Sequence, residues 1–186
     1  MRHRVMRSAF AVALAALVIA APSAMAEDTA SASAAQNGKY CSIQLDTAPE
    51  GEVSPVAAKA CSDVSIDQAR AEMHRQYAAK RRAAGDSAAV TYVLMHWYQN
   101  VNYNRDQQGA YWEFSGARCD TAGYRINPDD FWRTNLSSIV GNYDCFVARV
   151  YNIALDSAAD FNVHVDGNGR WLGAYSDNVG RIQIHA

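Results

Sequence analysis

The side chains in this sequence with the most chemical capacity are its histidines and one pair of adjacent carboxylates. His96, His164 and His185 fall in stretches with strand-like alternation, where a packed or exposed histidine is the usual outcome. Asp129 and Asp130 follow an Asn-Pro turn signal, which is typical of a solvated turn. The sequence has no GxSxG nucleophile elbow and no HExxH zinc motif. We therefore expect no catalytic residues and no cofactor.

The first residues have the pattern of a secretory signal peptide. A basic segment, residues 2–7, precedes an apolar stretch, residues 9–21, and Ala24-Met25-Ala26 is a small-x-small cleavage site. We predict a signal peptide over residues 1–26 and a secreted, extracellular mature protein, with an uncleaved anchor as the alternative. No later stretch approaches the roughly 20 apolar residues that a membrane helix needs, so we expect no membrane partner.

The cysteines could form disulfides or a metal site. They are Cys41, Cys61, Cys119 and Cys145. In an exported chain an even number indicates disulfides, although four cysteines allow three pairings. We favour Cys41–Cys61 and Cys119–Cys145, because each pair then closes a local loop and would stabilise the fold by about 3 kcal/mol. Zinc is the weaker hypothesis, because no pair has CxxC spacing.

The charge balance argues against polyanionic partners. The chain has 17 Lys and Arg against 19 Asp and Glu, and loss of the basic leader makes the mature protein more acidic. Nucleic acid requires clustered basic residues, whereas the one basic run, residues 80–82, is expected to end a helix. Roughly 160 residues remain after cleavage, enough for one domain with a proper core. We expect a monomer that does not bind nucleic acid.

The mature chain begins with a segment rich in alanine and serine, and we predict a flexible linker over residues 27–39. Residues 40–45 alternate like a strand. Residues 46–55 carry two prolines and a glycine, which indicates a loop.

A helix follows this loop. Ser65 and Gln68 fit a capping box, and Gly85 is a natural stop. One apolar stripe runs along the segment at helical spacing: Ile66, Ala69, Met73 and Tyr77. We therefore predict an N-terminal Cys–loop–helix unit over residues 40–86.

From residue 88 onward, aromatic and β-branched residues dominate. The predicted strands are residues 91–98, 109–114, 135–140, 145–151, 161–165 and 181–184. The segment Asp-Gly-Asn-Gly-Arg, residues 166–170, is a strong turn signal between the last two strands. Several short strands separated by turn signals predict an all-β sandwich.

Two parts of this region repeat one pattern. Residues 132–139 align with residues 175–182, with aromatic over aromatic and apolar over apolar. The segments upstream align as well, and they place Tyr98 over Tyr151. Internal similarity of this kind predicts two like units, and two four-stranded Greek keys that face each other across one core would satisfy it.

At these residues the sequence resembles the βγ-crystallin superfamily, and more narrowly the secreted bacterial crystallin-type proteins that include metalloproteinase inhibitors. One motif of the family is a tyrosine followed five residues later by an aromatic residue, and Tyr98 and Tyr103 match it. The segment WRTNLSS, residues 132–138, keeps the aromatic and both serines of another. The resemblance implies a mainly β fold, with a two-Greek-key crystallin-like domain over residues 88–186 behind the unit at residues 40–86.

The resemblance also implies a role for one serine. In the family, the serine that closes each motif hydrogen-bonds back to the folded hairpin of its own Greek key. Ser137 takes this place in the first copy, and Gly180 in the second cannot form the bond. The alternative is that Ser137 and Ser138 are ordinary polar residues at a strand edge.

Many members of the family bind calcium through the same segment, and here the ligands are depleted. Arg133 and Thr134 stand at the acidic positions of the first copy, and Gly180 and Arg181 replace the hydroxyls of the second. Calcium requires six to eight oxygens. We therefore predict no metal site, and Asp177 is the one residue that we retain as a candidate calcium ligand.

For function, the resemblance implies a non-enzymatic protein, with an extracellular protease as the possible partner of a peptidase inhibitor. The similar inhibitors present a loop inside a short cysteine-bounded ring, and this chain has only residues 145–147 in a comparable place. The alternatives are a secreted binding or toxin-like module for glycans or the cell envelope, and a structural, stress-resistant protein. Trp97, Trp132 and Trp171 could stack on sugars or belong to the core.

Overall fold

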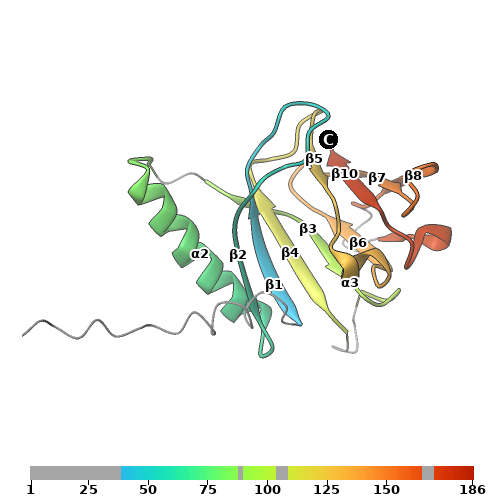
Figure 1. The fold of residues 1–186 in the computed structure, drawn as a ribbon, viewed down its shortest axis with the longest axis horizontal. Coiled ribbons are helices and arrows are strands. Elements are labelled where there is room, and N and C mark those ends of the chain that lie inside the picture. Colours follow the sequence, from blue (N-terminus) through green and yellow to red (C-terminus); the bar gives the residue numbers. More distant parts are fainter. Residues whose placement is uncertain (1–38, 88–89, 104–108, 165–169) are drawn as a thin grey trace, which may run out of the picture.

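The computed structural model describes residues 39–87, 90–103, 109–164 and 170–186. This part of the chain is mainly β, with two sheets and one long helix (Figure 1). In chain order the elements are β1 (Tyr40–Leu45), β2 (Val56–Ser62), α2 (Ile66–Ala83), β3 (Tyr92–Tyr98), β4 (Tyr111–Gly116), β5 (Tyr124–Ile126), α3 (Asp130–Arg133), β6 (Ser138–Gly141), β7 (Val147–Tyr151), β8 (Ala158–Asn162), β9 (Arg170–Trp171), the single-turn helix η1 (Gly173–Tyr175) and β10 (Arg181–His185). Among these described helices, none is long and apolar enough to cross a membrane.

The larger sheet has six strands in the order β2-β1-β4-β3-β6-β9, and the smaller has the order β5-β10-β7-β8. Helix α2 lies on one side of the larger sheet and the smaller sheet lies on the other (Figure 1). The predicted signal peptide, nearly all of the predicted linker and most of the predicted turn at residues 166–170 lie outside the described residues.

The predicted helix is confirmed, and its cap differs in one detail. Ser65 Oγ accepts a hydrogen bond from the Gln68 backbone N–H at 3.2 Å. The Gln68 side chain does not complete the box, because its Oε1 accepts from Ser62 Oγ instead. Ala69 and Met73, from the predicted stripe, are buried against the sheet. The helix ends two residues before Gly85, which takes a left-handed φ of 76°.

Strand β2 was not predicted, since its sequence, VAAKACS, is rich in alanine and has low strand propensity. It forms because it pairs antiparallel with β1 and is tied to it through Cys41 and Cys61, which face each other in the register. On its other side β1 pairs parallel with β4, from Tyr40 opposite Tyr111 onward. The N-terminal residues therefore extend the sheet that the later strands begin.

Other boundaries also required correction. The strand predicted at 161–165 lies at 158–162, and the one predicted at 145–151 begins at Val147. Residues 142–145 instead form a tight turn, closed by a hydrogen bond from the Cys145 N–H to the Asn142 carbonyl. The strands β5 and β9 are three and two residues long, too short to give a periodic signal.

The aligned segments occupy corresponding positions in the two sheets. In the β3–β6 pair, Tyr98 lies opposite Ser138, and in the β7–β10 pair, Tyr151 lies opposite Arg181. The backbone N–H that precedes each second strand bonds to the carbonyl of the matching tyrosine, at 3.0 Å in the first copy and 2.8 Å in the second. The repeat seen in the sequence is thus a repeat of strand register.

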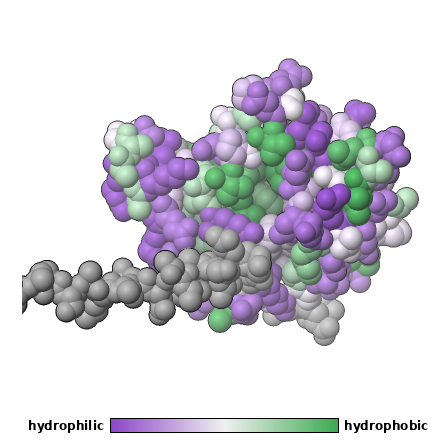
Figure 2. All heavy atoms as spheres, viewed as in Figure 1, coloured by the Kyte–Doolittle hydropathy of each residue, from purple (hydrophilic) through white to green (hydrophobic). Residues whose placement is uncertain are grey.

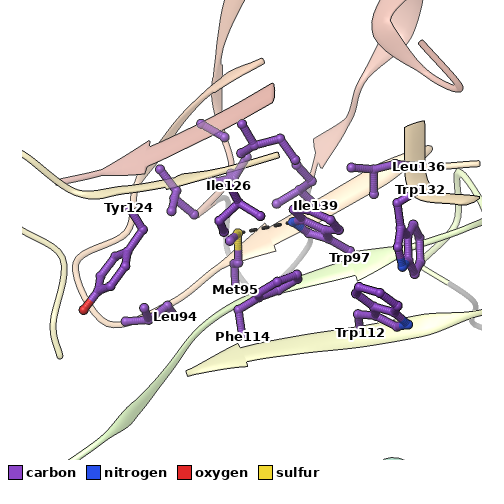
Figure 3. Close-up of a cluster of buried hydrophobic side chains, with 14 of the residues drawn as sticks. Leu94, Met95, Trp97, Trp112, Phe114, Tyr124, Ile126, Trp132, Leu136 and Ile139 are labelled. Carbon is purple, nitrogen blue, oxygen red and sulfur yellow. Dashed lines mark hydrogen bonds between the residues drawn. The ribbon is translucent and has the colours of Figure 1, made fainter. Parts of the chain in front are cut away.

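An aromatic core fills the space between the sheets (Figure 3). Trp97 and Trp132 are fully buried and meet edge to face, with 5.9 Å between ring centroids. Phe114 packs against Trp97 at 4.4 Å. The interpretation of Trp97 and Trp132 as core residues is therefore correct, while Trp171 is 54% exposed.

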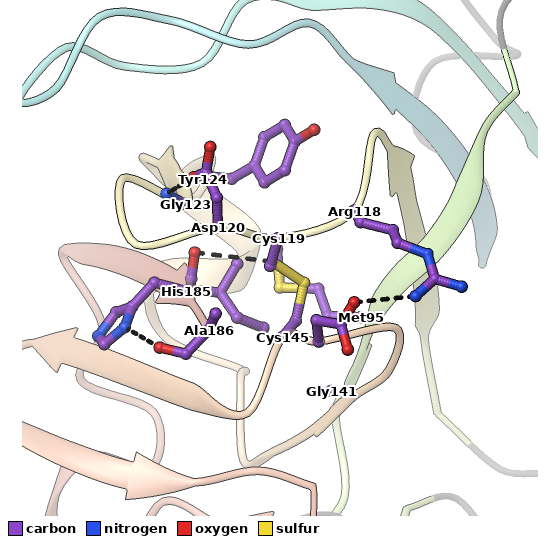
Figure 4. Close-up of a disulfide and its surroundings, with 12 residues drawn as sticks. Met95, Arg118, Cys119, Asp120, Gly123, Tyr124, Gly141, Cys145, His185 and Ala186 are labelled. Carbon is purple, nitrogen blue, oxygen red and sulfur yellow. Dashed lines mark hydrogen bonds and ion pairs between the residues drawn. A yellow bond between two sulfur atoms is a disulfide. The ribbon is translucent and has the colours of Figure 1, made fainter.

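Both predicted disulfides are present, Cys41–Cys61 and Cys119–Cys145. The second joins the segment after β4 to the turn that precedes β7 (Figure 4). All four cysteines are paired, which is consistent with an oxidising, extracellular location.

Candidate ligand-binding site

The residues singled out in the sequence have structural roles. Asp129 caps α3 by accepting a hydrogen bond from the Trp132 N–H at 3.0 Å. His164 and His185 each bond a backbone carbonyl through Nδ1. Within the described ranges, no three side chains from His, Cys, Asp and Glu are grouped to hold a metal.

The roles of the adjacent serines differ from the prediction. Ser137 Oγ does not bond to the hairpin of its own copy; it donates to Asp177 Oδ1 at 3.1 Å, across to the turn of the other copy. Ser138 Oγ makes the bond back, to the Asn100 carbonyl at 2.7 Å in the loop after β3. Side chains alternate across a strand, so this one-residue step decides which hydroxyl faces the hairpin.

A buried ion pair that the sequence analysis missed lies beneath α2. Glu113 on β4 is 1% exposed. Its carboxylate accepts two hydrogen bonds from Arg70 on α2, from Nε at 2.8 Å and from Nη2 at 2.6 Å. Ser42 Oγ donates at 3.3 Å, and His96 Nε2 lies 3.6 Å away. Burial opposes ionisation, but the bonds and charge of Arg70 and His96 outweigh it and lower the pKa of Glu113 to about 2.

Tyrosine rings continue this face of the sheet beyond Glu113. Tyr98 on β3 and Tyr111 on β4 are stacked, with 4.9 Å between centroids and 17° between planes. Tyr103 meets Tyr98 edge to face at 6.0 Å. Burial raises the pKa of Tyr98 and of Tyr111, so both phenols stay neutral and can donate as well as accept hydrogen bonds.

These rings line a cavity of about 480 Å³ where β4 and α2 both begin. We call it the tyrosine pocket, after Tyr40, Tyr98, Tyr103 and Tyr111. Ser65 and Asp67, from the start of α2, form its polar side. The Asp67 carboxylate is held by Arg70 at 2.7 Å, so the ion pair that fixes α2 on the sheet also fixes this wall.

Only one signal in the sequence could have pointed to this pocket. Tyr111 and Glu113 stand two residues apart in a strand, so they share a face, and a glutamate on a face that is otherwise covered needs a partner. Arg70 lies 43 residues earlier and is one of many arginines, so the sequence does not identify it as that partner.

A second exposed feature is the turn at residues 142–146, next to the Cys119–Cys145 disulfide (Figure 4). Tyr143 and Asp144 both take left-handed backbone conformations, with φ of 46° and 69°. Arg118 holds Asp144 at 3.1 Å. Tyr143 and Phe146 are exposed by 50% and 39%. The result is a braced turn that presents two aromatic side chains.

Comparison of the chain with models of protein families, with curated proteins and with solved structures gives no match.

Proposed function

We propose that this protein is an extracellular, non-enzymatic binding protein that holds a carbohydrate in the tyrosine pocket. The observation that carries the proposal is the meeting of four tyrosine rings with a serine and an aspartate in one open cavity. Sugars present flat apolar faces that stack on aromatic rings and hydroxyls that need both donors and acceptors. A cavity of about 480 Å³ is within the size range of small-molecule sites.

The scaffold of this proposal is a pair of crystallin-like Greek keys. In support, β6 returns to lie beside β3, the fourth strand beside the first, and β10 lies beside β7 in the same way. The third strand of each set, β5 or β9, lies in the sheet of the other set. A resemblance to the secreted crystallin-type proteins, a cleaved signal peptide and a monomeric state belong to the same proposal.

The test is a glycan array with the purified mature protein, followed by calorimetry with any sugar retained. Tyr40→Ala removes one wall of the pocket and is expected to weaken binding at least tenfold. Tyr143→Ala removes an exposed tyrosine elsewhere and serves as the matched control. The proposal fails if no sugar is retained, or if Tyr40→Ala binds as the parent does.

A second candidate, peptidase inhibition, is favoured by the turn at residues 142–146. Its aromatic tip is braced by a disulfide and an ion pair, so little conformational entropy would be lost on docking into a protease cleft. Thermolysin-like and subtilisin-like proteases are mixed with a micromolar excess of the protein. Tyr143→Ala should abolish any inhibition and Tyr40→Ala should preserve it, which separates the two candidates. Full protease activity throughout would eliminate this one.

A further inference from the structure

Two further hollows lie on the opposite face of β4, where Trp112 points away from the tyrosine pocket. Their volumes are about 450 and 190 Å³. Trp112 and Asp129 line both, so the two hollows are neighbours, and together we call them the Trp112 groove. Phe131 lines the larger hollow and Val56 the smaller one, and these two residues are 43% and 57% exposed.

The walls of the smaller hollow are mostly apolar. They include Ile43, Leu45, Val53, Phe114, Ile126 and Pro128. Figure 2 shows a hydrophobic area in the middle of the viewed face, over the strands between α2 and the smaller sheet, with hydrophilic residues around it. Apolar surface of this kind in a concave site favours a ligand with a hydrophobic body.

One cation lies in this apolar setting. Lys59 Nζ is 4.0 Å from the centroid of the Trp112 ring. Across residues 39–87, 90–103, 109–164 and 170–186, no carboxylate lies within ion-pair distance of it and no acceptor bonds to it. The Asp129 carboxylate acts on Lys59 through its charge, and it is already used to cap α3. Burial lowers the pKa of Lys59, and the charge of Asp129 only partly opposes this.

The Trp112 ring partly stabilises the charge of the Lys59 ammonium group, but it accepts no conventional hydrogen bond from the three N–H donors of that group. A carboxylate delivered by a ligand would form a charge-assisted bond to these donors. Its apolar chain would replace water along Trp112 and the walls. Lys39 lines the larger hollow, so the lining of the two hollows includes two lysines and one carboxylate, that of Asp129.

We propose that the Trp112 groove binds an amphiphilic monocarboxylate of the medium-chain fatty-acid type, with its carboxylate on Lys59 and its chain along Trp112. Of the lining residues, this site shares Gly109 alone with the tyrosine pocket, and the proposal does not depend on carbohydrate binding. The charge of Lys59 selects the head group, and the volume of the two hollows limits the size of the chain.

The experiment is calorimetric titration of the full mature protein with decanoate below its micelle concentration, and with decanol as a neutral ligand of equal chain length. The wild type is expected to bind decanoate saturably and more tightly than decanol. Lys59→Met keeps the length of the side chain without its charge, and should weaken decanoate binding at least tenfold with decanol unchanged. Lys59→Arg should restore the preference for the acid.

Lys80→Met is the matched control, because Lys80 bonds the Ala57 carbonyl on the same hairpin and does not line the groove. It should bind decanoate as the wild type does. No saturable binding of decanoate to the wild type would overturn the proposal. So would equal affinity for acid and alcohol, or a Lys59→Arg protein that folds and shows no preference.

Discussion

The ion pair beneath α2 leads to an asymmetric prediction for its two partners. Arg70→Met leaves the Glu113 carboxylate buried without its main donor, whereas Glu113→Gln leaves an arginine whose side chain is 35% exposed and can turn toward water. Removing one partner of a buried pair costs about 3–5 kcal/mol when the remaining charge stays buried. Loss of a hydrogen bond to a group that can be rehydrated costs about 1–2 kcal/mol. We therefore expect Arg70→Met to be clearly the less stable variant near neutral pH.

The pH dependence gives an independent magnitude for the same pair. Glu113 has a folded pKa of about 2 against 4.5 for the free group, and the difference corresponds to about 3 kcal/mol. Because the folded pKa is depressed, this stability is present above pH 4.5 and is lost as the pH falls toward 2. The stability advantage of wild type over Glu113→Gln should therefore fall by about 3 kcal/mol over that interval, from about 1–2 kcal/mol near neutral pH, so that Glu113→Gln becomes the more stable protein near pH 2.

The assay is urea unfolding, with the disulfides intact, followed by tryptophan fluorescence at several pH values from 2 to 7. Fluorescence is a suitable probe because Trp97 and Trp132 are fully buried in the folded state. Subtracting the unfolding free energy of Glu113→Gln from that of wild type at each pH removes the contribution of the titratable groups that both proteins share. A difference that stays constant from pH 2 to 7, or Glu113→Gln proving less stable than Arg70→Met, would refute the reasoning.

Three further predictions concern packing and titration. Gly123→Ala should lose at least about 2 kcal/mol of unfolding free energy in urea, since Gly123 has a φ of 63° and a Cβ there would lie 2.0 Å from the Ile184 carbonyl oxygen; unchanged stability would show that the segment can shift. Ser138→Ala should cost about 1 kcal/mol because it removes the hydrogen bond of a fully buried hydroxyl to the Asn100 carbonyl, and Ser137→Ala should cost less in the same measurement because its partner Asp177 is exposed and can be rehydrated; the reverse order would count against the assigned roles. Burial raises the pKa of Tyr124 to about 12, so absorbance at alkaline pH should show it ionising after the exposed tyrosines, and Tyr124→Phe should lower the amplitude of the late ionisation by one tyrosine, with Tyr98 and Tyr111 still contributing to it.

Much of the fold could be predicted because its determinants are local. The helix at residues 66–83 has its cap, stripe and basic end within one segment. Most strands alternate clearly enough to be placed within a few residues. The pairing of the cysteines followed from the preference for short loops, and both bonds are present.

The features that the sequence did not predict depend on contacts between residues that are distant in the sequence. Strand β2 depends on β1 and a disulfide rather than on its own propensity. The parallel pairing of β1 with β4 joins Tyr40 to Tyr111, which are 71 residues apart in the sequence. Whether Ser137 or Ser138 bonds to the hairpin depends on the register in which β6 pairs with β3. The alternation of polar and apolar residues in the sequence does not fix that register.

By itself, the sequence determined the helix at residues 66–83, most of the strands and the existence of a repeated pattern, and it favoured the correct disulfide pairing, because each of these depends on neighbouring residues or on loop length. The tertiary structure alone decided that Glu113 meets Arg70, that four separate tyrosines share one cavity, and that Lys59 lies over Trp112. The physical reason is that nothing in the sequence next to these residues distinguishes them from other residues of the same type. Their burial, their charge partners and hence their chemistry arise only when the helix and both sheets pack together.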